Sequence, residues 1–296
     1  MGNILTKQFY RQRKDFEDSC AGRDAGLTFP EGVRCSTDIA YADDGIKAHV
    51  LDIYRPEDSQ EKILPVIINV HGGGLIIGNK EFNRYFCALL CKKGFLVYSI
   101  EYRLIPDCLI YDQIADVFMA MDYIKERLAA DGGDSSHVYM AGDSGGACLI
   151  TYANAIQNST NIARAANVTP SGLRINALGF ISGMFYTSRF DKIGLFLPKY
   201  LYGRDYKKTS FAKYVNPENR ELLNSLAPVW LVTSHNDFLR RYTTDFEKAL
   251  TRAEREHELV VFPKNKKLTH AFSVFEPFLP ESSAVIDMMV EYLRKF

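Results

Sequence analysis

The chain has 296 residues, and its 36 lysine and arginine residues balance its 36 aspartate and glutamate residues, so the formal net charge is zero. Hydrophobic residues make up 47% of the sequence and charged residues 24%, a globular composition that excludes wholesale disorder. A neutral chain has no general attraction to nucleic acid or to anionic membranes, and no unbroken apolar run is long enough for stable membrane insertion.

The N-terminal segment is polar and lacks the apolar stretch of a secretory signal, which predicts a cytoplasmic location. The opening MGNILT fits the short N-myristoylation pattern at Gly2, which often arises by chance. The cysteines form no CxxC pair and no Cys/His metal spacing. Cys87 and Cys91 share a face of a predicted helix, where we expect them to pack as small apolar groups. We expect no metal and no cofactor.

Beyond this segment, apolar runs alternate with helical patterns along the chain. Strands are expected, in order, at Lys47–Tyr54, Leu64–Val70, Phe95–Ile100, His137–Ala141, Ile175–Ser182, Pro228–Ser234 and Leu259–Phe262. Helices are expected at 81–93, near 112–129, after Ser144 and from about Ser282 to Arg294. Runs such as VIINV and LVYSI are typical of parallel strands buried on both faces. The alternation predicts one α/β domain over 1–296, with a mostly parallel central sheet flanked by helices.

The connection between the strands expected to end at Ser182 and to start at Pro228 is long and rich in aromatic residues. Long connections inside compact domains are often lids or binding loops. We therefore expect residues 184–216 to form part of a cap over a site. The alternative is an excursion whose aromatic residues only pack it against the body.

The most informative motif is GDSGG at 142–146, between a predicted strand and a predicted helix. A nucleophilic serine needs an exposed Oγ on a tight strand-to-helix turn, and flanking glycines let the backbone pack closely there. A helix that begins at Ser144 also directs free N–H groups toward developing negative charge. GxSxG alone is a weak signal, but in this context it makes Ser144 the candidate nucleophile.

A second motif, HGGG at 71–74, follows the strand LPVIINV. Consecutive glycines can turn main-chain N–H groups toward a substrate without obstruction by side chains, and such donors stabilise an oxyanion. The alternatives are a flexible turn or a phosphate loop. A phosphate loop is excluded because neither GxxxxGK[ST] nor GxGxxG is present.

A nucleophilic serine also needs a base and an acid, and in serine hydrolases of this sheet type the chain order is Ser, Asp or Glu, His. Downstream of Ser144 the histidines are His235, His257 and His270. His257 lies in the charged run REREHEL, which is typical of a solvated helix end. Asp237 directly follows a predicted strand, where the acid should emerge, and His270 lies beyond the next strand. We therefore expect Asp237 to be the acid and His270 the base.

Taken together, these motifs resemble the hormone-sensitive-lipase-like family of α/β-hydrolase esterases. The resemblance rests on HGGG at 71–74, EYRLIP at 101–106, GDSGG at 142–146, NDFL at 236–239 and HAF at 270–272. It implies the α/β-hydrolase fold, with a cap built from residues of about 1–40 and the insertion at 184–216. It also implies that Tyr102 and Arg103 buttress the structure rather than react.

The resemblance implies a role for each site residue. Ser144 would be the nucleophile, Asp237 the acid and His270 the base. The oxyanion hole would consist of backbone N–H groups, those of Gly73, Gly74 and Gly145.

This sequence departs from the family pattern at three places. The elbow reads GDSGGA where the family usually has GDSAGG, Phe238 replaces a common proline, and Ala271 replaces a common glycine. Gly145 still supplies an N–H group, so these departures bear on rate and pocket shape more than on the triad.

The expected function is hydrolysis of small-molecule esters through an acyl-enzyme. The aromatic-rich cap and the HGGG loop suggest a confined pocket, for which the family resemblance implies acyl chains of roughly two to six carbons. The same triad also serves amidases and carbohydrate deacetylases, which the sequence does not separate from esterases. A non-catalytic ligand-binding homologue is the alternative of another class, although such proteins usually lack a triad member. A homodimer is left open.

Overall fold

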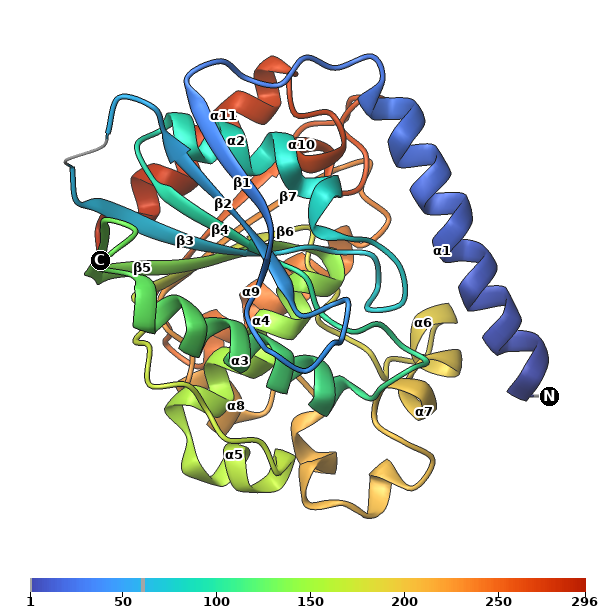
Figure 1. Cartoon of the computed structure of the whole chain (residues 1–296). Coiled ribbons are helices and arrows are strands. Elements are labelled where there is room, and N and C mark those ends of the chain that lie inside the picture. Colours follow the sequence, from blue (N-terminus) through green and yellow to red (C-terminus); the bar gives the residue numbers. More distant parts are fainter. Residues whose placement is uncertain (1, 60–61) are drawn as a thin grey trace.

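The computed structural model describes residues 2–59 and 62–296, with side chains from residue 6 onward. Its centre is an eight-stranded sheet in the order β1-β2-β4-β3-β5-β6-β7-β8 (Figure 1). β2 runs antiparallel to both of its neighbours, and all pairs from β4 to β8 are parallel. The strands are β1 (Val33–Ala40), β2 (Val50–Pro56), β3 (Leu64–Val70), β4 (Leu96–Ile100), β5 (Gly133–Asp143), β6 (Ala177–Ile181), β7 (Val229–Ser234) and β8 (His257–Phe262).

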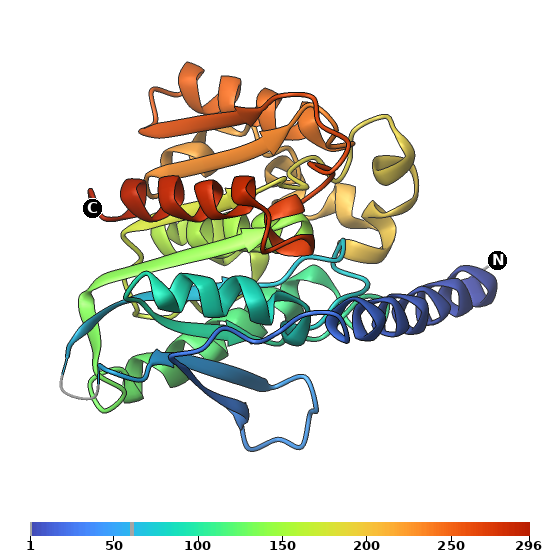
Figure 2. The ribbon, with the colours of Figure 1, turned by 90° about the horizontal axis from the view of Figure 1, so that it is seen from above.

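Helices cover both faces of this sheet (Figures 1 and 2). One face carries α3 (Ile110–Arg127), α4 (Ser144–Asn158), α5 (Thr160–Ala166), α8 (Arg220–Asn224) and α9 (Arg240–Arg252). The other carries α2 (Arg84–Lys92), α10 (Phe272–Phe275) and α11 (Pro280–Leu293). The expected α/β architecture with a mostly parallel sheet is therefore confirmed.

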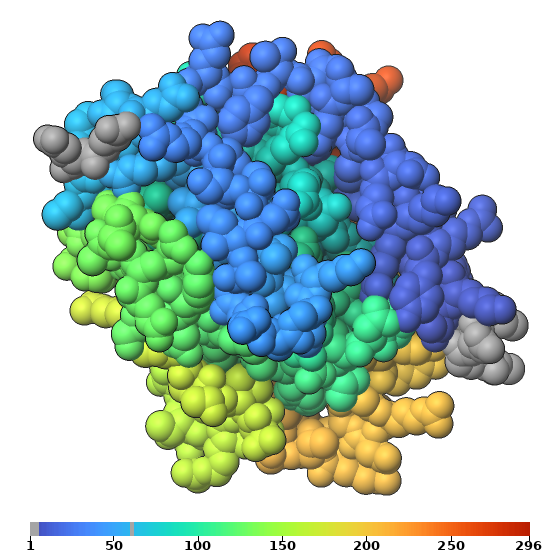
Figure 3. Space-filling model, in the orientation of Figure 1, coloured from blue at the N-terminus to red at the C-terminus, as the bar shows by residue number. Residues whose placement is uncertain are grey.

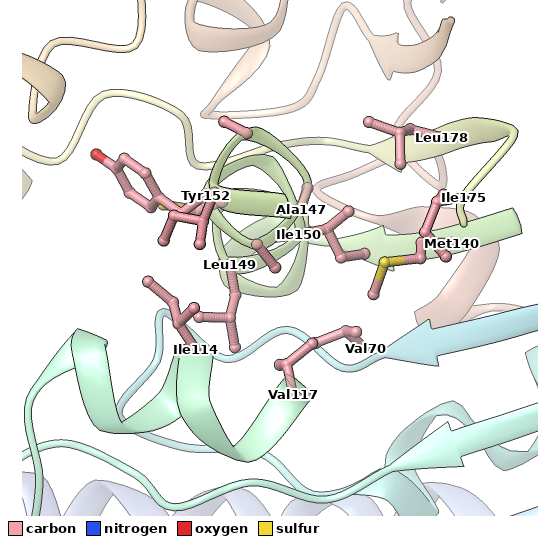
Figure 4. Close-up of a cluster of buried hydrophobic side chains, with 14 of the residues drawn as sticks. Val70, Ile114, Val117, Met140, Ala147, Leu149, Ile150, Tyr152, Ile175 and Leu178 are labelled. Atoms are coloured by element: carbon pink, nitrogen blue, oxygen red, sulfur yellow. The ribbon is translucent and has the colours of Figure 1, made fainter. Parts of the chain in front are cut away.

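Each face of the sheet has its own apolar core, because successive strand residues point to opposite sides. In β5, Val138 and Met140 belong to the core under α3 and α4, whereas Tyr139 and Ala141 belong to the core under α2 and α11. In the first core, Val70, Met140 and Leu178 from adjacent strands pack beside Ile150 of α4 (Figure 4). Burial on both faces explains why the parallel strands read as continuous apolar runs.

Several element boundaries differ from those expected. β2 begins at Val50 rather than Lys47, and β5 begins at Gly133 rather than His137. The prediction that His257 ends a solvated helix was wrong. The helix α9 ends at Arg252, and His257 is the first residue of β8. β8 is the last strand of the sheet and is only partly buried, so its charged residues remain compatible with a strand.

The N-terminal segment forms a long helix, α1 (Gly2–Asp24), which lies along one side of the body rather than in either helical layer (Figures 2 and 3). Its N-terminal half lies next to α6 (Lys192–Phe196) and α7 (Pro198–Leu201), which come from the aromatic-rich insertion (Figure 1). In the myristoylation pattern, Met1 and the side chains of residues 2–5 lie outside the described residues. Within the described chain, none of the helices is both long enough and apolar enough to cross a bilayer.

Candidate active site

The nucleophile candidate Ser144 lies at the junction of β5 and α4. Its backbone has a φ of 48°, the left-handed conformation expected of a sharp strand-to-helix turn. A side chain at Gly146 would place its Cβ 2.1 Å from the carbonyl oxygen of Val70, so only glycine fits where α4 crosses β3. The turn is therefore held in this conformation by close backbone packing.

A continuous hydrogen-bonded chain joins Ser144 to His270 and Asp237. The Nε2 atom of His270 lies 2.9 Å from the Ser144 Oγ, and Nδ1 lies 2.7 Å from the Asp237 Oδ1. A carboxylate only accepts, so Nδ1 carries the proton and the neutral ring accepts the serine hydroxyl at Nε2. The structure thus brings together these three residues from the ends of β5, β7 and the loop after β8.

The Asp237 carboxylate is fixed by further donors. Oδ1 accepts the Leu239 N–H at 2.8 Å, and Oδ2 accepts the Thr233 hydroxyl at 2.8 Å. Burial raises the pKa of Asp237, but His270 and these donors outweigh burial and hold the pKa below its usual range. The carboxylate is therefore ionised near neutral pH and able to orient the imidazole.

The glycine loop 71–74 lies beside Ser144. Gly73 and Gly74 have φ values of 101° and 62°, and both line the same cavity as Ser144. A Cβ on Gly145 would lie 2.9 Å from the backbone nitrogens of both Gly74 and Leu75, so the loop and the start of α4 are in close contact. This crowding explains the glycine at 145, where the family usually has alanine.

Two buried polar side chains, those of Asp143 and Asn83, stabilise the glycine loop. Asp143 accepts the Gly72 N–H at 3.0 Å and the Asn83 side-chain amide at 2.9 Å. Burial raises the pKa of Asp143, and the bond from Asn83, the nearby histidines and the Gly72 N–H oppose this only partly. Asn83 gave no sequence signal because its partner is distant in the chain.

His71 and Tyr102 hold the strand end that carries the loop. The Nε2 atom of His71 lies 3.0 Å from the Glu101 Oε1, and the Tyr102 hydroxyl donates to the His71 carbonyl at 2.8 Å. Burial lowers the pKa of His71, but the Glu101 carboxylate outweighs it and the pKa lies above its ordinary value. Arg103 pairs with the buried Asp116 at 2.6 Å. These contacts are structural, as expected for Tyr102 and Arg103.

A cavity of about 570 Å³ opens onto Ser144 and His270. Apart from the polar groups around Ser144 and the side chain of Lys192, its walls are almost entirely apolar. They include Phe9 and Phe16 of α1, Ile193, Phe196 and Leu197 of the insertion, and Ile76, Ile77, Phe82, Met184, Phe238, Leu239 and Phe275. The walls contributed by α1 were not predicted individually, although Phe9 and Phe16 lie seven positions apart, a spacing that places them on one helical face.

Two of the departures from the family pattern flank His270, and one of them, Phe238, lines this cavity. The exposed ring of Phe238 lies against the His270 ring, with centroids 4.4 Å apart. Ala271 has a φ of 48° and donates its N–H to the Ser182 Oγ at 3.0 Å. Glycine adopts this left-handed conformation without a steric cost, which explains why the family usually has glycine at position 271.

In residues 2–59 and 62–296, no three His, Cys, Asp or Glu side chains are grouped to hold a metal ion.

Comparisons with known proteins agree with this architecture. The model of a family described as having the alpha/beta hydrolase fold matches residues 67–273. The chain is similar to esterase B from Lactobacillus Rhamnosis, with a TM-score of 0.92, 22% identity and coverage of 100% of this chain and 96% of the other. It is also similar to a bacterial heroin esterase, with a TM-score of 0.72, 22% identity and coverage of 98% and 92%.

Curated relatives match more locally. The probable isoprenylcysteine alpha-carbonyl methylesterase ICME of Oryza sativa subsp. japonica is 29% identical over 184 residues, or 58% of this chain and 44% of the relative. The tuliposide A-converting enzyme b1 of Tulipa gesneriana is 30% identical over 131 residues, or 40% of this chain and 35% of the relative. The matches thus span less than half of these relatives. With its family match over 67–273, the chain belongs to the alpha/beta hydrolase fold family, and the expected hormone-sensitive-lipase-like resemblance is confirmed.

Proposed function

We propose that the protein is a serine carboxylesterase that hydrolyses small esters with apolar acyl groups. The observation that carries this proposal is the unbroken hydrogen-bonded chain Ser144–His270–Asp237 at the floor of an apolar cavity. Relatives named as methylesterases and structural neighbours named as esterases support the same reaction class. The cytoplasmic location stays a prediction from the sequence, and a homodimer stays open.

The reaction proceeds in two acyl-transfer steps. His270 Nε2 accepts the Ser144 Oγ proton as Oγ attacks the ester carbonyl carbon, and Asp237 stabilises the imidazolium that forms. The N–H groups of Gly73, Gly74 and Gly145 donate to the tetrahedral oxyanion. The carbonyl then re-forms, and His270 protonates the departing alkoxide. In the second step His270 accepts a proton from a water molecule as that water attacks the acyl carbonyl carbon. His270 then returns the proton to the Ser144 Oγ, and the carboxylic acid leaves.

The cavity walls favour an ester with an apolar acyl group over the alternatives. An acetylated sugar exposes hydroxyl groups that lose their hydrogen bonds to water unless the site supplies partners. The wall residues beyond Ser144 are mainly Phe, Ile, Leu and Met side chains, which supply none. We propose short acyl chains, roughly two to six carbons, as the preferred group. The α1 helix and residues 184–216 would form the cap that encloses it.

The test compares wild type with Ser144→Ala on p-nitrophenyl acetate, butyrate and octanoate, with the exposed Ser188→Ala as matched control. Wild type and Ser188→Ala should turn over the shorter esters, and Ser144→Ala should lose roughly 10⁴-fold or more in kcat, because no nucleophile remains. Equal turnover by Ser144→Ala would refute the assignment. A folded wild type that is inert on all three esters and unlabelled by a fluorophosphonate would favour the non-catalytic binding homologue.

A further inference from the structure

The side of α1 that faces the body carries a narrow stripe of residues at helical spacing. Phe9 and Phe16 both line the cavity. The Phe9 ring contacts the Tyr200 ring of the insertion with centroids 5.2 Å apart, and the Phe16 ring contacts the Phe82 ring at 4.8 Å. Between them on the same face lies Arg13. The helix is therefore a wall of the cavity and also carries Arg13 toward the body, as it does Arg23 near its C-terminal end.

The Arg13 guanidinium reaches past the cavity wall to the backbone of two loops. Its Nε donates to the Ile76 carbonyl at 2.8 Å, and Nη2 donates to the carbonyls of Leu104 and Ile105 at 3.0 and 2.7 Å. Nη1 donates to the Asp107 Oδ2 at 2.7 Å. All three nitrogens are engaged, and the Arg13 side chain is 18% exposed. This rigid fork of donors is specific to arginine, since a lysine ammonium cannot span the same acceptors.

Ile76 belongs to the loop that carries the candidate oxyanion donors. The N–H groups of Ile76 and Ile77 donate to the Gly73 carbonyl at 3.2 and 3.0 Å and close a tight turn. Leu75, with a φ of 68°, lies in an unfavourable conformation and is held through its carbonyl by Gln113 Nε2 at 3.1 Å. The strained turn is thus held from the body by Gln113 and from α1 by Arg13.

We propose that Arg13 is a positioning residue that couples the docking of α1 to the geometry of the oxyanion loop. The proposal rests on the ester-hydrolase function proposed above. When α1 is docked, Arg13 holds the Ile76 carbonyl, whereas Phe9 and Phe16 of the same helix line the cavity that would take the acyl group. Without the Arg13 contact, the turn at 73–77 relaxes and the N–H groups of Gly73 and Gly74 leave their alignment with the oxyanion. Misplacement of about 1 Å can cost roughly 10²-fold in rate.

The kinetic test uses full-length Arg13→Ala and Arg13→Lys, with Arg11→Ala as matched control. Arg11 is on the same helix, but it is 83% exposed and pairs with Asp15 at 3.7 Å. With p-nitrophenyl butyrate, Arg13→Ala should lower kcat about 10- to 100-fold with KM changed less than about twofold. The Ki of a trifluoromethyl ketone, whose adduct carries the oxyanion, should rise by the same factor. Arg13→Lys should lie in between, and Arg11→Ala should match wild type.

Phe16→Ala separates loop positioning from a simple wall effect. It removes apolar contact with the acyl group but leaves the Arg13 hydrogen bonds in place, so it should raise KM more than it lowers kcat. If Arg13→Ala instead raises KM with kcat and the ketone Ki within about twofold of wild type, Arg13 only holds the wall and the proposal is overturned.

A second measurement does not depend on turnover. Hydrogen–deuterium exchange of a peptide covering 72–78 should be at least about threefold faster in Arg13→Ala than in wild type or Arg11→Ala, because the loop loses a support and opens more often. Unchanged exchange overturns the proposal even if the protein hydrolyses no ester. The activity of Ser144→Ala tests only the proposed esterase function. Failure of that function can therefore be told apart from failure of the proposed role of Arg13. If Arg13→Ala does not fold, Asp107→Ala, which weakens the same clamp at an exposed position, should accelerate exchange of the same peptide.

Discussion

Two regions of the molecule meet at the cavity and are held in different ways. We call Ser144, His270, Asp237 and the glycine loop 71–74 the catalytic floor, and α1 with α6 and α7 the canopy. The floor sits on β3, β5 and β7, and β7 is buried along its whole length. In the canopy, α6 has no buried residue, and Phe196 remains 58% exposed. The floor is thus part of the core, whereas the canopy joins the core mainly through the buried Pro198 and Leu201 of α7.

The difference assigns separate tasks to the two regions. Proton transfer and oxyanion stabilisation need atoms held within a fraction of an ångström, which rigid strand ends provide. Substrate admission needs a surface that moves, and elements with few buried apolar contacts open at low free-energy cost. Arg13 is one of the contacts that join α1 to the body, and it is the one that reaches the loop of the floor through the Ile76 carbonyl. Mutations in the floor should therefore change the rate most, and mutations of half-exposed apolar residues of α1 should change stability little.

The largest expected effect on the rate comes from a substitution in the catalytic floor. Asp237→Asn should lower kcat by roughly 10⁴-fold, because an amide that donates to Nδ1 favours the wrong imidazole tautomer and leaves Nε2 protonated. Thermal unfolding and circular dichroism would check that the fold is retained while ester turnover is measured. An Asp237→Asn enzyme within tenfold of wild type would remove Asp237 from the proposed machinery.

Substitutions in the sheet that carries the floor should cost more stability than substitutions in α1. Leu178 of β6 is fully buried, so Leu178→Ala should lower the free energy of unfolding by about 2–5 kcal/mol. Phe9→Ala, on the half-buried face of α1, should cost less than about 1.5 kcal/mol, since its ring stays partly exposed. Urea unfolding measures both. Equal losses would show that the canopy is as much a part of the cooperative core as the sheet.

The pH dependence of stability sharpens the contrast. The pKa of Asp237 is depressed in the folded state, so its contribution to stability is complete above its unfolded pKa and is lost as pH falls through the folded pKa. The difference in unfolding free energy between wild type and Asp237→Asn should therefore be constant above about pH 5 and shrink as the pH falls further. Asp107→Asn, at the exposed canopy clamp, should show a smaller difference that added salt reduces. A difference at Asp237 that is constant with pH would contradict the assigned pKa direction.

The smallest effect is expected at Ala271. Glycine relieves the cost of a φ of 48° but removes a buried methyl group, and these contributions oppose one another. Ala271→Gly should therefore change the free energy of unfolding by less than about 1 kcal/mol and leave kcat within about twofold. A large loss of activity would show that the alanine methyl group, rather than the backbone conformation, positions His270.

The residues of the floor could be expected to lie together because their sequence signals are local. GDSGG, HGGG and Asp237 each follow a buried strand, His270 follows β8, and the carboxyl ends of parallel strands meet at one edge of a sheet. The helix α9 could also have been predicted, since Tyr242, Phe246, Ala249 and Leu250 follow helical spacing among its charged residues.

The sequence indicates the canopy and the edge strand β1 less clearly. β1 is mostly exposed and shows no regular apolar alternation, so its strand conformation comes from pairing with β2. Arg13 binds backbone carbonyls, and a carbonyl carries no side-chain identity that a sequence could reveal. Such contacts depend on the tertiary position of α1, which spacing within the helix does not determine.

The most direct test of the central claim is to treat the intact protein with a fluorophosphonate and map the adduct by peptide mass spectrometry. The account predicts a single covalent adduct on the peptide that contains Ser144, absent in Ser144→Ala and greatly slowed in Asp237→Asn. Labelling of a different serine, or no labelling of a folded wild type, would contradict it.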